Sequence, residues 1–457
     1  MFPGRKMHNK KKGRRIIVIG AGASGLIAGA AAAKSGASVT VLEKNEKAGK
    51  KIYITGKGRC NLTNDCSTAE FFDHVVTNPR FLYSSIYSFD HDAVKAFMEQ
   101  NGCTVKTERG ERVFPVTDHA SDVTKALVSA LSSAGGRILY HKKAEELIFD
   151  QESLEQRHVC GVRLSDGEEL PADAVIVCTG GLSYPSTGST GDGYRFAKEA
   201  GHTVLPCEPS LVSFHTEEDW PRELEGLSLK NVSIRVIPNE NPDSPADANR
   251  APSGEMVRKH KSKPVYEGFG EMLFTHFGVS GPLVLAASSR TSFRKHPEGY
   301  KLYIDLKPAI PQNELTERIE KMLAAVPDRQ FVHAAAPLFP ARLLRTMVSL
   351  SGIDPERKAR TVNSAEIRSF AELIHAVPLT VKESGGFDEA VITRGGVNVK
   401  EINPSTMESK LVSGLYFGGE VIDVDAVTGG FNLQIAWSTG HLAGQSAAEG
   451  GNELALH

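Results

Sequence analysis

Four β-branched apolar residues at positions 16–19 begin the most informative stretch of the chain. Such a run predicts one buried strand of a parallel sheet. A glycine-rich turn over residues 20–25 follows, then an alanine-rich segment that predicts a helix, and then a second apolar strand over residues 39–42. Strand, glycine turn, helix and strand in this order are typical of a dinucleotide-binding βαβ unit.

The residues of this turn each suit a dinucleotide. Gly20 allows the tight turn, Gly22 lets the backbone approach a pyrophosphate, and Gly25 lets the helix pack on the strand. Glu43 ends the second strand, where a carboxylate accepts hydrogen bonds from ribose hydroxyls. Arg14 and Arg15 before the apolar run imitate a signal peptide or membrane span, but the glycines and the second strand argue against both.

Further along the chain, the sequence predicts two more strands that end in glycines and one helix that begins after a glycine, all at the same edge of the sheet. Residues 174–179 form an apolar strand that ends in Thr179, Gly180 and Gly181. Residues 414–420 form another that ends in Gly419 and Glu420, and Gly430 precedes a helix that contains Asn432. Ligands bind at the carboxyl edge of such sheets, and a helix N-terminus there stabilises an anion. Helices are expected at 93–100 and 121–132, and a β-meander over 137–170.

The pattern divides the chain into a Rossmann-type domain and an insert. We predict a disordered basic arm at 1–14, a dinucleotide-binding domain formed by 15–205 and 377–457, and an inserted substrate or cap domain at 206–376, with short strands and a helical part at about 278–375. The fold class is therefore α/β: a Rossmann-type domain with a β-meander, plus an insert that is partly barrel-like and partly helical.

Composition excludes several functional classes. The net charge of −2 gives no global field for nucleic acid or membrane. Six scattered cysteines without an export signal favour reduced thiols in the cytoplasm. Because no Cys or His cluster has metal-ligand spacing, we expect no metal. The pattern leaves the oligomeric state open.

The loop at 46–66 is rich in glycine and lysine and predicts ligand contacts. Lys51 and Arg59 can neutralise phosphates, and Asn61 and Thr63 can bind a polar ring edge. The alternative is a solvated loop. Cys60 with Cys66 could form a redox pair, against the alternative of two structural thiols.

Two candidates lie in the predicted insert. His276 is either a structural histidine or a substrate-facing acid or base. The basic stretch at 258–263 is either a solvated loop or a phosphate or RNA contact.

Together these segments resemble the BaiN/YhiN-type FAD-dependent flavoproteins, within the two-dinucleotide-binding superfamily that includes glutathione reductase. The matching motifs are VIGAGASGLIAG, GKKIYITGKGRCNLTN, VCTGGLSYPSTGSTGDGY, EMLFTHFGVSGP, TRGGV and GLYFGGEVIDVDAVTGGFNLQIAWSTGHLAG. Members of that family are described as aminoacetone oxidases, reductases of oxidised bile acids, or NAD(FAD)-utilising dehydrogenases. The resemblance implies non-covalent FAD with an insert that caps the flavin. The implied cofactor residues are Gly20, Gly22, Ala23, Ser24, Gly25, Glu43, Lys44, Lys51, Arg59, Cys60, Asn61, Leu62, Thr63, Ala144, Thr179, Gly180, Gly181, Gly419, Glu420, Gly430, Asn432 and Leu433.

The expected function is a hydride exchange between flavin N5 and a small organic substrate or NAD(P)H, with Cys60 and His276 as candidate catalytic residues. No second GxGxxG motif is present, so NAD(P)H is expected only as a transient electron donor. The alternatives are an NAD-dependent dehydrogenase and a flavin-carrying protein that binds or modifies RNA. The balanced charge predicts a small-molecule substrate, with neither a nucleic acid nor a membrane as partner.

Overall fold

The computed structural model describes residues 13–150, 157–239 and 263–450. It forms two compact units, one from Met1–Pro209 with Phe387–His457 and one from Ser210–Gly386. Residues 1–12 of the predicted arm lie outside the described residues, while the guanidinium of Arg14 donates to the backbone oxygen of Asp173 at 2.9 Å. Within the described ranges, no helix combines the length and apolarity that crossing a membrane requires.

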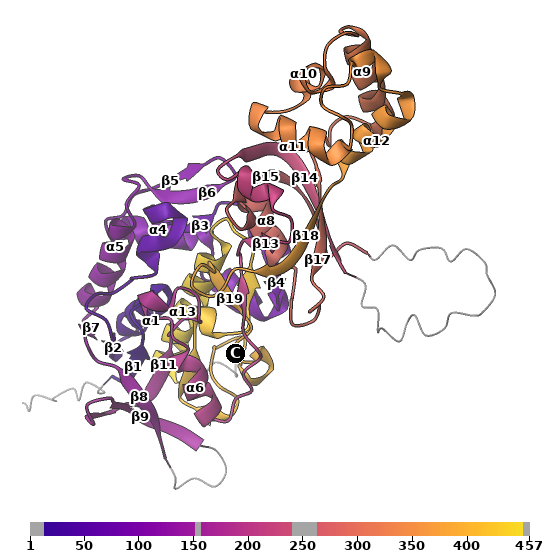
Figure 1. The fold of residues 1–457 in the computed structure, drawn as a ribbon. Helices are drawn as coiled ribbons and strands as arrows, with labels where there is room; N and C mark the ends of the chain where they lie inside the picture. Colours follow the sequence, from indigo (N-terminus) through magenta and orange to yellow (C-terminus); the bar gives the residue numbers. More distant parts are fainter. Residues whose placement is uncertain (1–12, 151–156, 240–262, 451–457) are drawn as a thin grey trace, which may run out of the picture. The chain divides into compact units, whose positions relative to one another are not determined.

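The first unit is built on a five-stranded parallel sheet in the order β21-β11-β1-β2-β7 (Figure 1). Its strands are β1 (Arg15–Ile19), β2 (Ser38–Leu42), β7 (Arg137–Leu139), β11 (Ala174–Val177) and β21 (Leu415–Phe417). The strands are apolar because helices cover the sheet. The Rossmann-type fold class is confirmed. Arg137–Leu139, which we expected in the meander, is instead the edge strand of this sheet, because it pairs with β2.

Two helices of the first unit pack unusually closely. These are α1 (Ala23–Lys34) and α13 (Phe431–Glu449), which lie side by side in Figure 1. A Cβ atom on Gly440 or Gly444 would lie 2.4 or 2.2 Å from a backbone oxygen of α1. The alanines of α1 and the glycines of α13 therefore let the two backbones approach.

Smaller elements complete the unit. The meander consists of β8 (Ala144–Asp150), β9 (Arg157–Leu164) and β10 (Glu169–Pro171), with β20 (Val412–Ser413) parallel to β9. The other strand groups are β3 (Thr63–Asn64), β6 (Arg112–Pro115) and β5 (Val105–Glu108); β4 (Val75–Thr77) with β22 (Asp425–Ala426); and β12 (Glu208–Ser210) with β19 (Ile392–Arg394). The remaining helices of four or more residues are α2 (Thr68–Phe71), α3 (Tyr83–Ser88), α4 (His91–Gln100), α5 (Ala120–Ser133) and α6 (Asp192–Glu199), together with the 3₁₀ segments η1 (Ile52–Gly58) and η3 (Pro79–Leu82).

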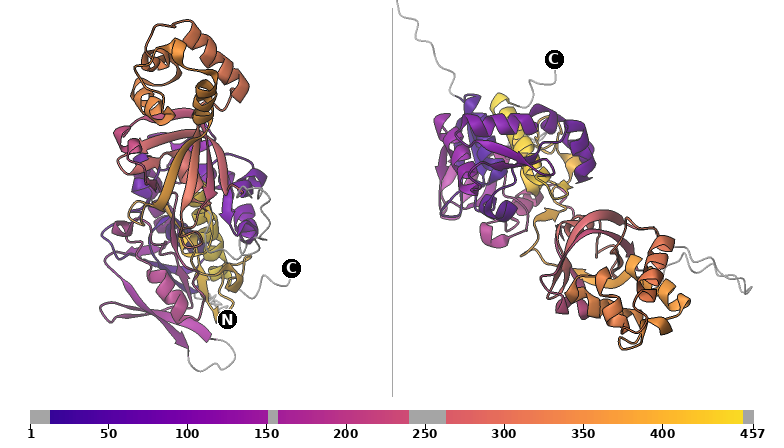
Figure 2. Two further views of the ribbon diagram at one scale, coloured as in Figure 1. Left: turned by 45° about the vertical axis from the view of Figure 1, so that its right-hand side comes forward. Right: turned by 90° about the horizontal axis from the view of Figure 1, so that it is seen from above.

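The second unit contains a closed antiparallel barrel of six strands in the order β13-β16-β15-β14-β17-β18, whose strands curve around a common interior in the right-hand view of Figure 2. They are β13 (Phe214–Thr216), β14 (Ser228–Pro238), β15 (Tyr266–Thr275), β16 (Gly278–Ser280), β17 (Tyr300–Asp305) and β18 (Val377–Ser384). Alternate side chains such as Ile234 and Phe274 fill the interior. We expected residues from 377 onward to belong to the dinucleotide-binding domain, but β18 pairs with β17 and β13 and closes the barrel.

Short and long helices accompany the barrel strands. They are α7 (Trp220–Glu223), α8 (Pro282–Ser288), α9 (Gln312–Ala324), α10 (Phe331–Ala334), α11 (Ala341–Ser351) and α12 (Ser364–His375). The helices α9 to α12 bury apolar faces that include Ile319, Met347 and Phe370. Asn363 caps α12 by accepting a hydrogen bond from the backbone of Glu366 at 3.0 Å.

One buried histidine of the Rossmann unit should make the folded protein less stable at acidic pH. His441 of α13 stacks on Phe89 with ring centroids 4.1 Å apart, and burial followed by the charge of Lys34 lowers its pKa to about 4 from 6.5. The folded protein therefore binds this proton less readily than the unfolded chain does. Stability should be full above about pH 6.5 and decrease as the pH falls toward 4, with a loss of about 2–3 kcal/mol.

Urea unfolding at about pH 7 and about pH 4.5 tests this expectation, with the change His441→Phe removing its share of the loss. An unchanged pH dependence in the variant would contradict it.

Candidate functional site

The turn between β1 and α1 contains three glycines with different surroundings. Gly20 has a φ of +102°, and a Cβ atom there would lie 2.5 Å from the backbone oxygen of Cys178. At Gly25 a Cβ would lie 1.8 Å from the backbone oxygen of Gly20. At Gly22, the N-cap of α1, no atom lies within 4 Å of that position. Packing thus accounts for Gly20 and Gly25, while Gly22 borders open space at a helix N-terminus, which suits a phosphate.

Two predicted residues at the end of β2 hold neighbouring loops in place. The carboxylate of the buried Glu43 accepts hydrogen bonds from the backbone N–H of Ala21 at 3.1 Å and from the backbone and side chain of Asn45 at 2.8 and 2.7 Å. Lys44 forms a 2.7 Å ion pair with Asp192. Burial favours the neutral form of Asp192, but the hydrogen bond and charge of Lys44 outweigh it and lower the pKa of this carboxyl.

The ends of β11 and β21 meet the start of α1. The hydroxyl of Ser24 lies 3.3 Å from the thiol of Cys178. A Cβ atom on Gly418 would lie 2.7 Å from Oγ of Ser24, and one on Gly419 would lie 2.8 Å from Cβ of Ser24. Segments almost 400 residues apart therefore converge on one side chain at the carboxyl edge of the sheet, as the glycine pattern predicted.

A polar cluster surrounds Glu420. Its carboxylate pairs with Lys51 at 2.7 Å, and accepts hydrogen bonds from the hydroxyl of Ser183 at 2.6 Å and the backbone N–H of Thr393 at 2.8 Å. Burial alone would raise the pKa of Glu420, but the charge and hydrogen bond of Lys51 outweigh it, and the pKa lies below its usual value. Gly181 lies beside this cluster, because its Cβ would be 2.9 Å from Oε1 of Glu420. Gly180 has a φ of +72° and lies next to Ser189; Thr179 precedes it.

The loop before β3 packs on the start of α13. A Cβ atom on Gly430 would lie 2.4 Å from the backbone of Thr63, whose hydroxyl donates to the side-chain oxygen of Gln434 at 2.6 Å. Oδ1 of Asn61 is buried and has no hydrogen-bond partner in the part of the chain that the structure describes. A buried acceptor of this kind fits the N–H group of a bound ring. Leu62 is buried, and its backbone oxygen accepts from Trp437 at 2.9 Å.

Two of the predicted contact residues, Arg59 and Asn432, have protein partners, and a third, Cys60, is buried. The guanidinium of Arg59 pairs with Glu108 at 2.5 Å and Asp118 at 2.6 Å, and lies 4.1 Å from the ring centroid of Phe114. The side chain of Asn432 bonds both the N–H and the oxygen of the Ala426 backbone, at 2.9 and 2.7 Å. Cys60 is fully buried with a φ of +60°, and burial raises the pKa of its thiol to about 12. A protonated, buried thiol does not support the redox-pair alternative.

The remaining predicted residues are at the edges of the site or elsewhere. Ala23 begins α1, Leu433 follows Asn432 in α13, and buried Ala144 begins β8. His276 belongs to the second unit, where its side chain is 71% exposed and Nδ1 lies 3.4 Å from the carboxylate of Glu225. The described residues of the basic stretch begin only at Lys263, so residues 258–262 lie outside the description.

The structure adds residues that the sequence did not single out. Ser183 and Thr393 bind Glu420, and Gln434 binds Thr63. Only the position of Ser183 after the Thr179–Gly181 strand end gave a local signal, since Thr393 and Gln434 become neighbours through tertiary folding.

One group of possible metal ligands, Asp65, His91 and Asp92, has ligand atoms within 4.8 Å of one another. Lys95 donates to Asp65 and pairs with Asp92 at 2.8 Å, so an ammonium group already lies among these carboxylates. We assign no metal to this group.

Comparisons with known proteins identify the family of this chain. The family model described as "HI0933-like protein Rossmann domain" matches residues 14–446. A 3-dehydro-bile acid delta(4,6)-reductase from Clostridium scindens is 31% identical over 95% of this chain and 99% of its own length. Ribosomal RNA dihydrouridine synthases from Haemophilus influenzae and Escherichia coli are 30% and 28% identical, each over 93% of this chain and over 96% and 95% of their own lengths. The chain therefore belongs to the HI0933-like family of FAD-binding flavoprotein oxidoreductases.

Proposed function

We propose that this chain holds FAD non-covalently along the carboxyl edge of its parallel sheet and reduces a carbon–carbon double bond conjugated to a carbonyl group. The observation that supports the cofactor site most directly is the meeting of Ser24 with Cys178, Gly418 and Gly419. Three separate strand ends thereby form one edge, and an extended dinucleotide needs such an edge.

Different residues of the chain would bind different parts of FAD. Gly22 and the N-terminus of α1 would take the pyrophosphate, and Glu43 the ribose hydroxyls. Glu420, held by Lys51, would orient the polyol chain, and the buried oxygen of Asn61 would accept a hydrogen bond from the ring. When bound, FAD supplies a hydride-transferring group. The N-terminus of α13, after Gly430, would favour negative charge on a group bound next to it.

The substrate class follows from what the relatives have in common. One is named for a 3-dehydro-bile acid and two for making dihydrouridine in ribosomal RNA. A 3-dehydro-delta(4,6) steroid and a uracil ring both contain a C=C bond conjugated to a carbonyl. Reduction adds a hydride to the carbon β to the carbonyl and a proton to the α carbon. The shared chemistry supports an ene-type reduction, for which we propose NAD(P)H as the electron donor.

A second candidate is the reduction of uridine within RNA. Two relatives with this printed activity support it, although the balanced charge of this chain predicts a small molecule. An NAD-dependent dehydrogenase without flavin is the less economical alternative, because membership of an FAD-binding family accounts for the glycines after β21 and before α13.

Anaerobic flavin bleaching tests the proposal. The purified protein should be yellow, with absorbance at about 450 nm, and NADH or NADPH should bleach it. A steroid enone should restore the colour at least tenfold faster than a saturated ketone of the same skeleton. A uridine-containing rRNA fragment in place of the enone tests the second candidate. A colourless protein, or colour restored only by oxygen after bleaching by amines, would contradict the ene-reductase proposal.

A further inference from the structure

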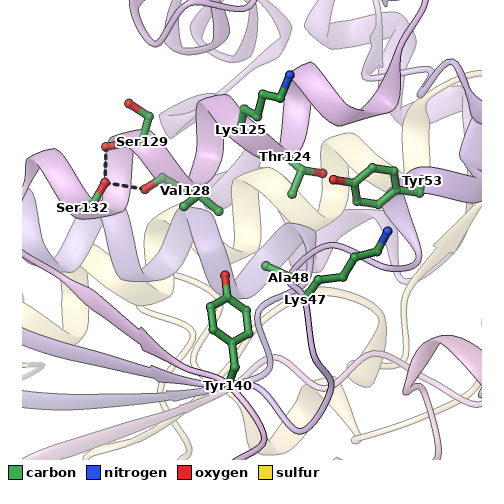
Figure 3. Close-up of a pocket in the computed structure, with 9 residues that line it drawn as sticks. All are labelled: Lys47, Ala48, Tyr53, Thr124, Lys125, Val128, Ser129, Ser132 and Tyr140. Atoms are coloured by element: carbon green, nitrogen blue, oxygen red, sulfur yellow. Dashed lines mark hydrogen bonds between the residues drawn. The ribbon is translucent and has the colours of Figure 1, made fainter.

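A hollow lies in the Rossmann unit, between α5, the loop that follows β2, and the end of β7 (Figure 3). Its volume is about 440 Å³, which is within the range of about 300–1,000 Å³ that small-molecule sites occupy. Its lining residues are Lys47, Ala48, Tyr53, Thr124, Lys125, Val128, Ser129, Ser132 and Tyr140. None of these nine is among the residues predicted to bind FAD, so the hollow is a candidate for a separate ligand.

The walls of this hollow are aromatic. Tyr53 and Tyr140 approach it from the loop and from the sheet edge, Ala48 lies between them, and Val128 lines it from α5 (Figure 3). Tyr140 is 39% exposed, which is high for a large apolar ring. Neither phenol hydroxyl has a hydrogen-bond partner among the described side chains and backbone. The Tyr140 ring and the two hydroxyls are thus available to a planar molecule that carries polar groups.

The charge of the hollow is positive. The ammonium of Lys47 lies 3.9 Å from the centroid of the Tyr53 ring, and no carboxylate pairs with it within the described ranges. Lys125 pairs with Asp122 at 3.1 Å, but Asp122 is not a lining residue, and the lining contains no acid. An anionic group is therefore favoured beside the aromatic walls.

We propose that this hollow binds a nucleoside monophosphate, with the base against the ring of Tyr140 and the phosphate at Lys47. A planar base with an anionic phosphate matches both the aromatic walls and the unpaired ammonium. Inorganic phosphate has no ring to stack, and a neutral nucleoside has no charge for Lys47. Each should therefore bind more weakly than the nucleotide.

Isothermal titration of AMP into the flavin-loaded protein tests the proposal. We expect saturable binding with one site, weakened at least tenfold by Lys47→Gln and by Tyr140→Ala. The matched controls are Lys34→Gln and Tyr87→Ala, which change an exposed lysine and an exposed tyrosine of the same unit outside the hollow. Adenosine and inorganic phosphate should each bind at least tenfold more weakly than AMP.

Four results would overturn the proposal. They are no binding of AMP, equal binding of inorganic phosphate or adenosine, equal loss in the control variants, and binding only to the flavin-free protein. The last result would mean that the hollow belongs to the cofactor site.

Discussion

Replacing Gly22 with alanine is expected to weaken FAD binding at least tenfold while leaving the free energy of unfolding unchanged within about 0.5 kcal/mol. The φ of −87° at this residue is accessible to alanine, and a Cβ there would contact no protein atom within 4 Å. The added methyl group would instead occupy the space that the pyrophosphate needs. Fluorescence titration of flavin-free protein with FAD, and urea unfolding of the same preparation, give the two quantities.

Gly25→Ala is the matched variant in the same turn. Its Cβ would lie 1.8 Å from the backbone oxygen of Gly20, so the turn must move. We expect the flavin-free protein to lose about 3 kcal/mol or more of unfolding free energy. Equal losses of stability in the two variants would contradict the different roles assigned to Gly22 and Gly25. Unchanged FAD affinity in Gly22→Ala would contradict the proposed pyrophosphate position.

Lys51→Met is expected to lower the free energy of unfolding of the flavin-free protein by about 3 kcal/mol. It leaves the carboxylate of Glu420 buried without its cation, although Ser183 and the backbone of Thr393 still donate to it. Loss of the positive charge should raise the pKa of Glu420 above its unfolded value. The loss in the variant should therefore develop as the pH rises through the unfolded pKa of a glutamate, about 4.3, whereas the wild-type pair should show no such loss.

Two further variants test the role of the Lys51 ammonium. The double change Lys51→Met with Glu420→Gln should recover most of the loss, because a neutral amide no longer needs the ammonium. Lys50→Met is the matched control, since Lys50 pairs at 3.3 Å with Glu46, whose side chain is 58% exposed, and should cost less than about 0.5 kcal/mol. A similar loss from Lys50→Met would show that the effect is not specific to the Glu420 cluster.

Local sequence patterns predicted the part of the fold that local forces specify. The strand at 16–19, the glycine turn and the start of α1 depend on neighbouring residues, and the structure places all three as expected. The segment from residue 377 onward was assigned to the dinucleotide-binding domain, but the partners of β18, namely β13 and β17, precede it by more than 70 residues, and no local signal identifies them.

The same limit applies to the predicted contacts. A free Arg59 in a lysine-rich loop suits a phosphate, yet folding brings Glu108 and Asp118 of distant segments to it. Asn432 lies at the predicted helix start, but its amide is used by the backbone of Ala426. The position of a glycine follows from backbone space, whereas the partner of a long polar side chain depends on the whole chain.

The strands that lead into and out of the barrel unit, β12 and β19, pair in one small sheet, and Arg394 forms an ion pair with Glu208 there. The chain thus leaves the Rossmann unit and returns to it through two adjacent, paired strands. The entropic cost of closing such a detour grows by only about 0.6 kcal/mol for each doubling of its length. Evolution can therefore lengthen, shorten or exchange the inserted domain without changing the topology of the Rossmann unit. Such changes offer a route by which relatives with one architecture acquire very different substrates.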